Sequence, residues 1–333
     1  MDDSQKPILV TGATGLLGNN VARCLQQNEE KTAVFIRNQP APEIFDGVRA
    51  QRFTGDITSL ADLEKAMSKC AGVIHCAGNV HMGWRQAKAQ HKVNVVGTRN
   101  VCTLAYQLNM RVVHVSTVNA LGVGKPGKVA NEDKNFGQAH PTPYVQTKMQ
   151  ADEEVKKWVN KGLNALIVHP GFMLGPYDWK LSSGRMLQAV VDGFVPFAPA
   201  GAMSICDVRD VAAGIVTAYR VGKVGRSYIL AGYNMTYLDA WRTFRGFFDK
   251  EGPHKVGSPF LMGTVGMLGD LMGRLGASEP DFNSASIALG SQYHVFSSDR
   301  AIKELGYTLR PLEQTVRDAY EWLSDHHGDM DDE

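Results

Sequence analysis

The segment near the amino terminus constrains the fold more than any other, because it joins an apolar run to regularly spaced glycines. Ile8-Leu9-Val10 precedes Gly12, Gly15 and Gly18, and a helical pattern covers residues Leu16–Gln27. This order predicts a strand, a tight turn and a helix. Glycines let a backbone approach phosphate closely, and a helix N-terminus attracts its negative charge. The segment therefore predicts a loop for the pyrophosphate of a dinucleotide, formed by Gly12, Thr14, Gly15, Leu16, Leu17 and Gly18.

The first half of the chain alternates short apolar runs with helical patterns. The expected strands are Ile8–Val10, Thr32–Ile36, Gln51–Phe53, Val73–Cys76, Val112–Ser116 and Ala165–Val168. The helices expected between them are Leu16–Gln27, Leu60–Lys69, Gln86–Leu108 and Tyr144–Asn160. Strands that alternate with helices favour a parallel sheet covered on both faces. The expected fold is therefore α/β, a Rossmann-type doubly wound parallel sheet with a smaller carboxy-terminal substrate lobe.

The pattern becomes less regular after Pro170, where glycines, prolines and aromatic residues are frequent. A helix at Asp210–Val221 and a strand at Ser227–Leu230 are expected to rejoin the sheet, and a helix near Leu312–Leu323 is expected to pack the lobe. The expected dinucleotide-binding domain comprises residues 1–170 and 204–232. The expected substrate lobe comprises residues 171–203 and 233–325, followed by a flexible tail at 326–333.

The charge balance gives no electrostatic reason to expect a nucleic acid partner, because the formal net charge is +1 over 333 residues. The partner expected is a small-molecule substrate. An apolar stretch from Pro259 to Gly269 is interrupted by Asp270 and Arg274, well short of the ~18 apolar residues that a membrane-spanning helix needs. We expect an amphipathic lid or interface helix there, and we do not expect membrane contact.

The five cysteines are scattered, with no Cys-x-x-Cys pair. This favours buried thiols in a reducing compartment over disulfides or a zinc site. The first residues are polar and acidic, so no secretory signal is expected and the expected location is the cytoplasm. His91, His114 and His169 show no ligand spacing, so no metal is predicted.

Tyr144 and Lys148 lie four residues apart in an expected helix, so their side chains project from one face. A free phenol has a pKa near roughly 10 and is a poor proton shuttle at neutral pH. A neighbouring ammonium favours the phenolate and lowers that pKa. Downstream of a dinucleotide loop, this pair predicts hydride-transfer chemistry in which Tyr144 moves the proton.

The end of the second expected strand indicates which dinucleotide binds. An Asp or Glu there usually holds a ribose 2′-hydroxyl, whereas an arginine suits a 2′-phosphate. The sequence Phe35-Ile36-Arg37-Asn38 offers Arg37, with no acid until Glu43. Arg37 can pair with a phosphate and stack on adenine, although a strand-end arginine can also be simply solvated. NADP(H) is therefore the expected cofactor, and NAD is the less favoured alternative.

With these motifs, the chain resembles the extended short-chain dehydrogenase/reductases, the broad NAD-dependent epimerase/dehydratase group, over nearly its whole length. The ordered motifs are Thr11-Gly12-x-x-Gly15-x-x-Gly18, Gly55-Asp56-Ile57, His75-Cys76-Ala77-Gly78, Asn94-Val95-Val96-Gly97-Thr98, Val115-Ser116-Thr117, Tyr144-x-x-x-Lys148, His169-Pro170-Gly171, Asp207-Val208-Arg209-Asp210 and Lys303-Glu304-Leu305-Gly306-Tyr307. Within the group, the chain looks most like the dihydroflavonol-4-reductase-like branch. Phe35-Ile36-Arg37 and Gly184-Arg185-Met186 indicate that branch.

The resemblance implies a role for each matching residue. Tyr144 would be the general acid/base, and Lys148 would lower its pKa and hold the nicotinamide ribose. Thr117 would hydrogen-bond the reacting oxygen, with the adjacent Ser116 as the rival for that role. Asn94 would brace the active-site helix and strand, or be a plain capping or buried amide. The other cofactor-binding residues would be Asp56 and Ile57 near the adenine, Ala77 and Gly78 along the cleft, Ser116, and Pro170 and Gly171 near the nicotinamide.

The first functional hypothesis is an NADPH-dependent carbonyl reductase or alcohol dehydrogenase that acts on a largely apolar ketone or aldehyde. It is favoured by Arg37 and by an apolar and aromatic pocket wall, although core packing is the alternative for such side chains. The candidate substrate-binding residues are Met82, Trp84, Thr117, Phe172 and Met173, and Tyr177, Trp179, Phe194 and Phe197 are further candidates for the wall.

The second hypothesis is a sugar or sugar-nucleotide epimerase that retains its cofactor, with Arg185, Arg209 and Arg226 available to hold a pyrophosphate, although each can equally be a surface arginine or a member of a buried pair. A 4,6-dehydratase is disfavoured, because no acidic pair follows Thr117. A non-catalytic NADP(H)-sensing protein is disfavoured too, because such relatives typically lose the catalytic tyrosine or lysine. Relatives often pair through two long helices, so the expected helices Gln86–Leu108 and Tyr144–Asn160 are the candidate homodimer surface. His81, in the loop after the fourth strand, is interpreted as solvated.

Overall fold

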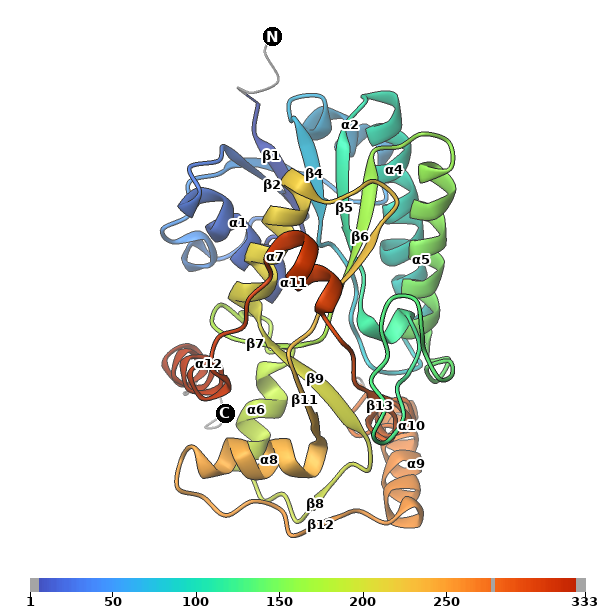
Figure 1. Ribbon diagram of the computed structural model, residues 1–333, viewed down its shortest axis with the longest axis vertical. Helices are drawn as coiled ribbons and strands as arrows, with labels where there is room; N and C mark the ends of the chain where they lie inside the picture. Colours follow the sequence, from blue (N-terminus) through green and yellow to red (C-terminus); the bar gives the residue numbers. More distant parts are fainter. Residues whose placement is uncertain (1–5, 277–278, 328–333) are drawn as a thin grey trace.

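A computed structural model describes residues 6–276 and 279–327 (Figure 1). Its central sheet has seven strands: β1 Ile8–Thr11, β2 Thr32–Ile36, β3 Gln51–Thr54, β4 Gly72–His75, β5 Arg111–Val115, β6 Ala165–Pro170 and β10 Ser227–Leu230. The strand order is β10-β6-β5-β4-β1-β2-β3, and every neighbouring pair is parallel. This is the order of the dinucleotide-binding fold with one further strand. The predicted doubly wound parallel sheet is therefore confirmed.

Helices cover both faces of this sheet (Figure 1). One face carries α1 Leu16–Gln27, α7 Val208–Val221 and α11 Asp299–Leu305, and the other carries α2 Leu60–Met67, α4 Gly97–Gln107 and α5 Pro143–Val159. Side chains alternate along a strand, so Ile8 and Val10 enter the core beneath α1 whereas Leu9 enters the opposite core. The packing of these two cores holds the strands in place, and the site residues lie at one edge of the sheet that the strands form.

The helix expected at Gln86–Leu108 consists of three consecutive pieces. They are α3 Ala87–Gln90, a π-helical turn η3 His91–Val96, and α4. π-helical turns are rare in proteins, and those that do occur often lie at functional sites. Asn94 lies in the π turn and is buried.

A second sheet forms the core of the lobe below the central sheet (Figure 1). Its strands are β11 Tyr233–Thr236, β9 Ala202–Asp207 and β13 Tyr293–His294, and β7 Phe172–Leu174 also pairs with β9. Three helices pack around it: α6 Gly184–Asp192, α8 Tyr237–Gly246 and α12 Leu312–His327. β9 belongs to the second sheet, although its residues 204–207 were expected in the dinucleotide-binding domain. α11 packs on the central sheet, although it was expected in the substrate lobe. The two parts of the chain are therefore more interleaved than the expected boundaries imply.

α12 continues to His327, although the tail was expected to begin at residue 326. The ring of His326 stacks on Trp322 with centroids 4.3 Å apart, which extends the packed part of the helix. Residues 328–333 of the expected tail lie outside the described residues.

Four further elements belong to the lobe. The short strands β8 Phe197–Ala198 and β12 Lys255–Val256 pair with each other, and α9 Pro259–Leu275 and α10 Ser284–Gly290 follow. No helix within residues 6–276 and 279–327 has both the length and the apolar composition to cross a bilayer.

Candidate active site

The glycine loop lies where the strand order reverses, between β1 and β4. Gly12 has φ +72°, and a Cβ on it would come within 2.7 Å of the Ala77 backbone. A Cβ on Gly18 would overlap the Gly12 carbonyl oxygen. The turn and α1 can therefore come this close only because both positions are glycine. The first turn of α1 contains no acidic residue. Its free N–H groups and the close loop backbone therefore fit a dinucleotide pyrophosphate.

A buried hydrogen-bond chain fixes the two strands on either side of this loop. The Thr11 hydroxyl lies 2.8 Å from His75 Nδ1 and accepts from the Ala77 N–H at 3.1 Å. His75 Nε2 lies 3.0 Å from the Thr98 hydroxyl. Burial lowers the pKa of His75, so the ring is neutral and serves as a bridge between β1, β4 and α4.

Tyr144 and Lys148 are positioned by the way in which α5 begins. The Thr142 hydroxyl accepts from the Val145 N–H at 3.3 Å, and a proline occupies the first helical position. Tyr144 therefore sits in the first turn, where a side-chain hydrogen bond links it to Thr117. One turn later, Lys148 Nζ donates to the Val115 carbonyl oxygen at 2.9 Å. The end of β5 and one face of α5 thus bring these side chains together.

The protonation state of Tyr144 differs from the expectation drawn from its spacing to Lys148. Burial raises the pKa of Tyr144 to about 12, and the hydrogen bond with Thr117 offsets this only in part. We had predicted a lowered pKa. A raised pKa keeps the phenol protonated at neutral pH, so in this structure it is a hydrogen-bond donor rather than a base.

Lys148 and Asn94 lie side by side along the Gly78 backbone. A Cβ on Gly78 would be 3.4 Å from both Lys148 Nζ and Asn94 Oδ1. Asn94 Oδ1 accepts from the Asn79 N–H at 2.8 Å, and its Nδ2 donates to the Thr147 hydroxyl at 3.0 Å. Asn94 therefore joins the loop after β4 to α5, which is the bracing position that the resemblance implied.

Thr117 and Ser116 face opposite sides of the chain, as neighbours in extended backbone do. The Thr117 hydroxyl meets Tyr144, whereas the Ser116 side chain faces the buried carboxylate of Asp152. Burial raises the pKa of Asp152, but contacts with His114, His169 and Ser116 outweigh it, so the net direction is down. The geometry favours Thr117 over Ser116 as the partner of the reacting oxygen.

His114 and His169 are buried partners of Asp152. His114 Nε2 lies 3.5 Å from Asp152 Oδ1, and His169 Nδ1 lies 3.9 Å from Oδ2. Burial lowers the pKa of both histidines despite this carboxylate. Within the described residues, no cluster of three or more His, Cys, Asp or Glu is arranged to hold a metal ion.

Two cations lie beside the far end of the dinucleotide loop. Lys180 Nζ donates to the Thr14 hydroxyl at 3.0 Å. Burial and the charge of Arg37 lower the pKa of Lys180, which places the two cations near each other. The pKa of Asp56 is lowered mainly by its hydrogen bonds with Thr58, with a smaller contribution from Arg37. Lys180 was not predicted, because it belongs to no motif and is 166 residues away from Thr14 in the sequence.

The remaining predicted cofactor residues line the same edge of the sheet. Ile57 packs over Gly97, where a Cβ would come within 3.1 Å of its side chain. Pro170 ends β6, and the Gly171 N–H donates to the Leu230 carbonyl at 3.1 Å. A Cβ on Gly171 would overlap the Ser204 carbonyl, so the chain turns from the central sheet into the lobe at this glycine.

The structure brings only part of the predicted substrate wall to Tyr144. Met82 and Val123 pack against a buried cluster formed by Ala139, Tyr144, Val145 and Leu289. The Trp84 indole N–H donates to the Ser284 hydroxyl at 2.9 Å. The other predicted side chains lie elsewhere: Phe172, Tyr177 and Trp179 in the lobe core, Met173 against the central core, Phe197 in β8, and Phe194 in solvent at 92% exposure.

His81 is not a solvated loop histidine, as the sequence had suggested, but is hydrogen-bonded to Glu279. Its Nε2 lies 2.9 Å from Glu279 Oε2, and Glu279 also accepts from the backbone N–H groups of Trp84 and Arg85. Asn283 Nδ2 donates to the Met82 carbonyl at 2.6 Å. The loop 79–85 is therefore tied to the segment before α10, through a partner 198 residues downstream.

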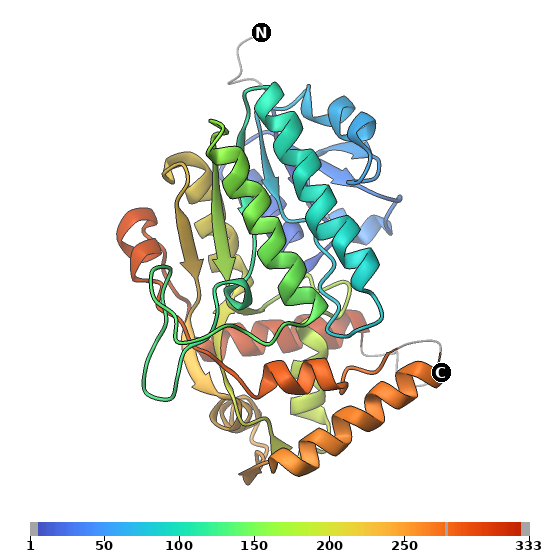
Figure 2. The same ribbon diagram turned by 90° about the vertical axis from the view of Figure 1, so that its right-hand side faces the viewer.

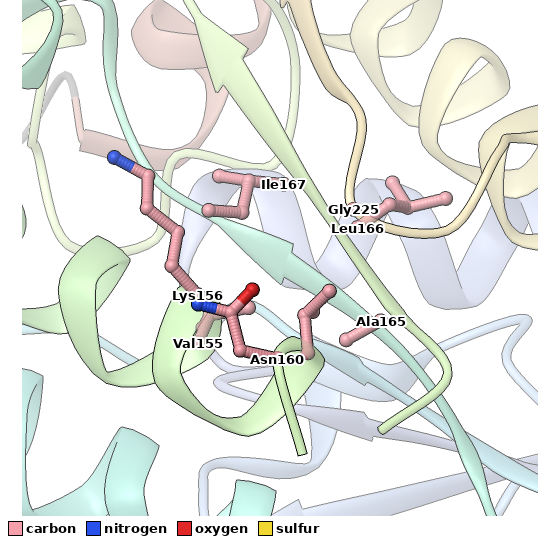
Figure 3. A pocket seen from close by; sticks show the side chains of 8 residues that line it. Val155, Lys156, Asn160, Ala165, Leu166, Ile167 and Gly225 are labelled. Atoms are coloured by element: carbon pink, nitrogen blue, oxygen red, sulfur yellow. The ribbon is translucent and has the colours of Figure 1, made fainter. Parts of the chain in front are cut away.

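A small cavity near α5 does not belong to this site. It measures about 90 Å³ and is lined by Val155, Lys156, Val159, Asn160, Ala165, Leu166, Ile167 and Gly225 (Figure 3). These residues lie at the carboxy-terminal end of α5, several turns from Tyr144. The cavity is too small for a dinucleotide and carries none of the predicted site residues.

The fold and the site together define an oxidoreductase of the extended short-chain dehydrogenase/reductase type. The sequence matches the NAD dependent epimerase/dehydratase family over residues 8–231, and the chain belongs to that family. The strand order, the glycine loop and the buried tyrosine and lysine on α5 are consistent with this membership.

Similar proteins cover almost the whole chain. A Synechocystis protein named as a dihydroflavonol 4-reductase is 27% identical over 330 residues, which cover 95% of this chain and 94% of that protein. Sterol demethylase protein B of Methylococcus capsulatus is 31% identical over 324 residues, covering 95% and 97%. The crystal structure of gox2253 superposes with a TM-score of 0.83 at 29% identity, covering 97% and 99%.

Proposed function

We propose that the protein is an NADPH-dependent carbonyl reductase that acts on a largely apolar ketone or aldehyde. The observation that carries this proposal is the surroundings of the Tyr144 phenol. The phenol is protonated and lies beside Thr117, and Tyr144 belongs to a buried apolar cluster with Ala139, Val145 and Leu289, against which Met82 and Val123 pack. Such a site offers hydroxyl donors to one carbonyl oxygen and apolar contact to the rest of a substrate.

The residues present are suited to reduction. NADPH, when bound, would supply hydride to the carbonyl carbon. As negative charge develops on the carbonyl oxygen, the hydroxyls of Tyr144 and Thr117 would donate hydrogen bonds to it. Tyr144 would then transfer its proton to complete the alcohol. The Lys148 ammonium, held one turn away by the Val115 carbonyl, would stabilise the phenolate that remains.

The preference for NADPH rests on Arg37 and Lys180. An exposed arginine at the end of β2 and an exposed lysine bonded to Thr14 put positive charge beside the loop. A 2′-phosphate carries two negative charges that such cations can pair, whereas a ribose 2′-hydroxyl is better served by a carboxylate. We therefore expect NADPH to bind more tightly than NADH.

An epimerase for sugar nucleotides is the second candidate, and the arginines argue against it. The three arginines that the sequence offered for a substrate pyrophosphate are paired with protein carboxylates: Arg185 with Asp281 at 2.8 Å, Arg209 with Asp207 at 2.6 Å and Asp318 at 2.7 Å, and Arg226 with Glu304 at 3.0 Å. The names of the two similar proteins refer to a dihydroflavonol and a sterol, both of which are ring systems and neither of which is a nucleotide sugar.

The proposal is tested by following NADPH absorbance with a panel of cyclic and aromatic ketones. We expect stoichiometric oxidation with at least one of them, and a fall of about a hundredfold or more in kcat for Tyr144→Phe. NADPH affinity should stay within about twofold in that variant, because the phenol contributes chemistry rather than charge pairing. Conversion of a nucleotide sugar to its epimer, with cofactor retained and none consumed, would replace this proposal by the epimerase.

A further inference from the structure

Helix α9 carries an apolar surface that no described residue covers. Seven of its large side chains have exposures between 38% and 83%: Phe260, Leu261, Met267, Leu268, Leu271, Met272 and Leu275. No other helix in the described part of the chain carries more than one exposed side chain of this kind. None of the α9 side chains belongs to the apolar cores of the protein.

The helix is held with this face outward by its opposite, glycine-rich side. A Cβ on Gly269 would overlap the Phe282 carbonyl, and one on Gly266 would lie 3.0 Å from Ser284 Cα. Gly273 lies as closely against Glu279. Figure 2 shows α9 along the lower edge of the molecule, with α10 between it and the rest of the protein. The outward direction of the apolar side chains is therefore a consequence of close backbone packing.

The width of the apolar face indicates what could cover it. At 3.6 residues per turn, the seven side chains spread over an arc of about 140°, and the three glycines occupy the opposite side. A helix that pairs with one other helix uses a narrower seam. Soluble monomers rarely expose a contiguous apolar patch of this kind. A broad and featureless apolar phase matches the face better than a second helix does.

The charges next to α9 favour an anionic surface. The exposed charged side chains on α9 and on β12 before it are Arg274 and Lys255, both cationic. Asp270, the acid in α9, is partly buried, and its Oδ1 accepts from the Ser284 N–H at 3.0 Å. Arg274 lies at the border of the apolar arc, from which a long side chain can reach headgroups.

We propose that the outer face of α9 binds the surface of a lipid bilayer with anionic headgroups, with the helix lying in the plane of that surface. From the sequence we had not expected membrane contact, because Asp270 and Arg274 interrupt the apolar stretch. The structure turns Asp270 inward and puts Arg274 at the border, so neither opposes contact from one side. The proposal does not depend on the proposed function.

A consequence for substrate access does rest on the proposed function. α10 lies between α9 and the candidate active site, and its Leu289 belongs to the same buried cluster as Tyr144. A bilayer on α9 would therefore be one helix away from Tyr144. An apolar ketone dissolved in that bilayer would reach the site without crossing bulk water.

The test is co-sedimentation of the full chain with phosphatidylcholine vesicles, with and without phosphatidylglycerol. We expect binding that increases with phosphatidylglycerol and weakens with salt. The double variant Leu271→Glu/Leu275→Glu should bind tenfold or more weakly, since each substitution removes apolar burial and adds a charge the lipid repels. The matched control is Ile302→Glu on α11, because Ile302 and Leu271 are 49% and 50% exposed. It should bind like the unaltered chain.

Thermal unfolding and NADPH oxidation with a water-soluble ketone should be unchanged in both variants, which separates lipid binding from folding and from catalysis. The proposal is overturned if the unaltered chain does not sediment with phosphatidylglycerol vesicles, or if the double variant sediments equally well. It is also overturned if the chain forms a dimer in solution that the double variant abolishes, because a second copy would then cover α9.

Discussion

The neighbouring residues Ser116 and Thr117 have the same functional group but different side-chain partners. Both are hydroxyls at the end of β5, and the resemblance implied either as the partner of the reacting oxygen. The structure directs Thr117 to Tyr144 and Ser116 to Asp152. A strand that places successive side chains on opposite sides thus divides two equivalent hydroxyls between a candidate catalytic role and a structural one.

This division predicts the behaviour of three variants. Thr117→Val should lower kcat by tenfold to a hundredfold, because one donor to the developing oxyanion is lost. Thr117→Ser keeps the hydroxyl and should retain most of the activity. Ser116→Ala should change kcat by less than about threefold. Steady-state NADPH oxidation measures all three, and a larger loss in Ser116→Ala than in Thr117→Val would exchange the two assignments.

A second prediction at this scale concerns the 2′-phosphate. Arg37→Asp should raise KM for NADPH by about tenfold or more and leave KM for NADH nearly unchanged, because a charged hydrogen bond is worth roughly 1.5–3 kcal/mol. Lys180→Met should act in the same direction with a smaller effect. Arg49→Met, at another exposed arginine of the same domain, is the control. An equal rise in KM for NADPH and for NADH would mean that these cations do not bind the 2′-phosphate.

At the scale of elements, the first strand, turn and helix were predictable because their requirements are local. Gly12 and Gly18 permit backbone approach that no other residue allows, and the three-residue spacing of Gly12, Gly15 and Gly18 is visible in the sequence. The same holds for the start of α5, where Thr142 and Pro143 precede Tyr144. Elements whose sequence pattern follows from local geometry could thus be predicted from the sequence. The parallel sheet that they predicted was confirmed.

Gly18 provides the test of that close approach. Gly18→Ala should lower the thermal midpoint and weaken NADPH binding, since its Cβ overlaps the Gly12 carbonyl and forces the loop open. We expect a destabilisation of about 1–3 kcal/mol. The control is Gly246→Ala on α8, where a Cβ meets nothing within 4 Å, and which should leave stability unchanged or slightly raised. Differential scanning calorimetry and cofactor titration measure both; an unchanged Gly18→Ala variant would contradict the packing.

At the scale of the whole molecule, the sequence could not reveal contacts between distant segments. Lys180 reaches Thr14 and Glu279 holds His81 across 166 and 198 residues, and neither pair belongs to a motif. The second sheet escaped prediction for the same reason, because β13 has only two residues and is defined by its partner β9. The raised pKa of Tyr144 likewise depends on its burial in the folded protein, which the spacing of residues along a helix does not reveal.

The buried histidines predict how the stability of the whole molecule depends on pH. Burial lowers the pKa of His75, His114 and His169 in the folded protein. Below about pH 6.5, the unfolded chain therefore binds more protons than the folded one. The free energy of unfolding should fall as the pH drops from about 7 to 5, by up to roughly 1.4 kcal/mol per pH unit for each histidine. The lowered pKa of Asp152 acts at lower pH, because its contribution is lost only below about pH 4.

Urea unfolding at several pH values measures this dependence. His114→Asn should make the decline between pH 7 and pH 5 shallower, since an amide takes up no proton. His91→Asn, at an exposed histidine, should leave the slope unchanged. If the free energy of unfolding depends on pH equally in His114→Asn and in the unaltered chain, His114 is not held in its neutral form by folding.

The central claim is that the protein reduces a carbonyl group with hydride from NADPH and a proton from Tyr144. It is tested most directly with NADPH that carries deuterium at both C4 positions of the nicotinamide, an aromatic or alicyclic ketone, and mass spectrometry of the alcohol formed. The account predicts one deuterium on the carbinol carbon, and loss of that product in Tyr144→Phe. An alcohol without deuterium, or a Tyr144→Phe variant that forms it at the same rate, would contradict the account.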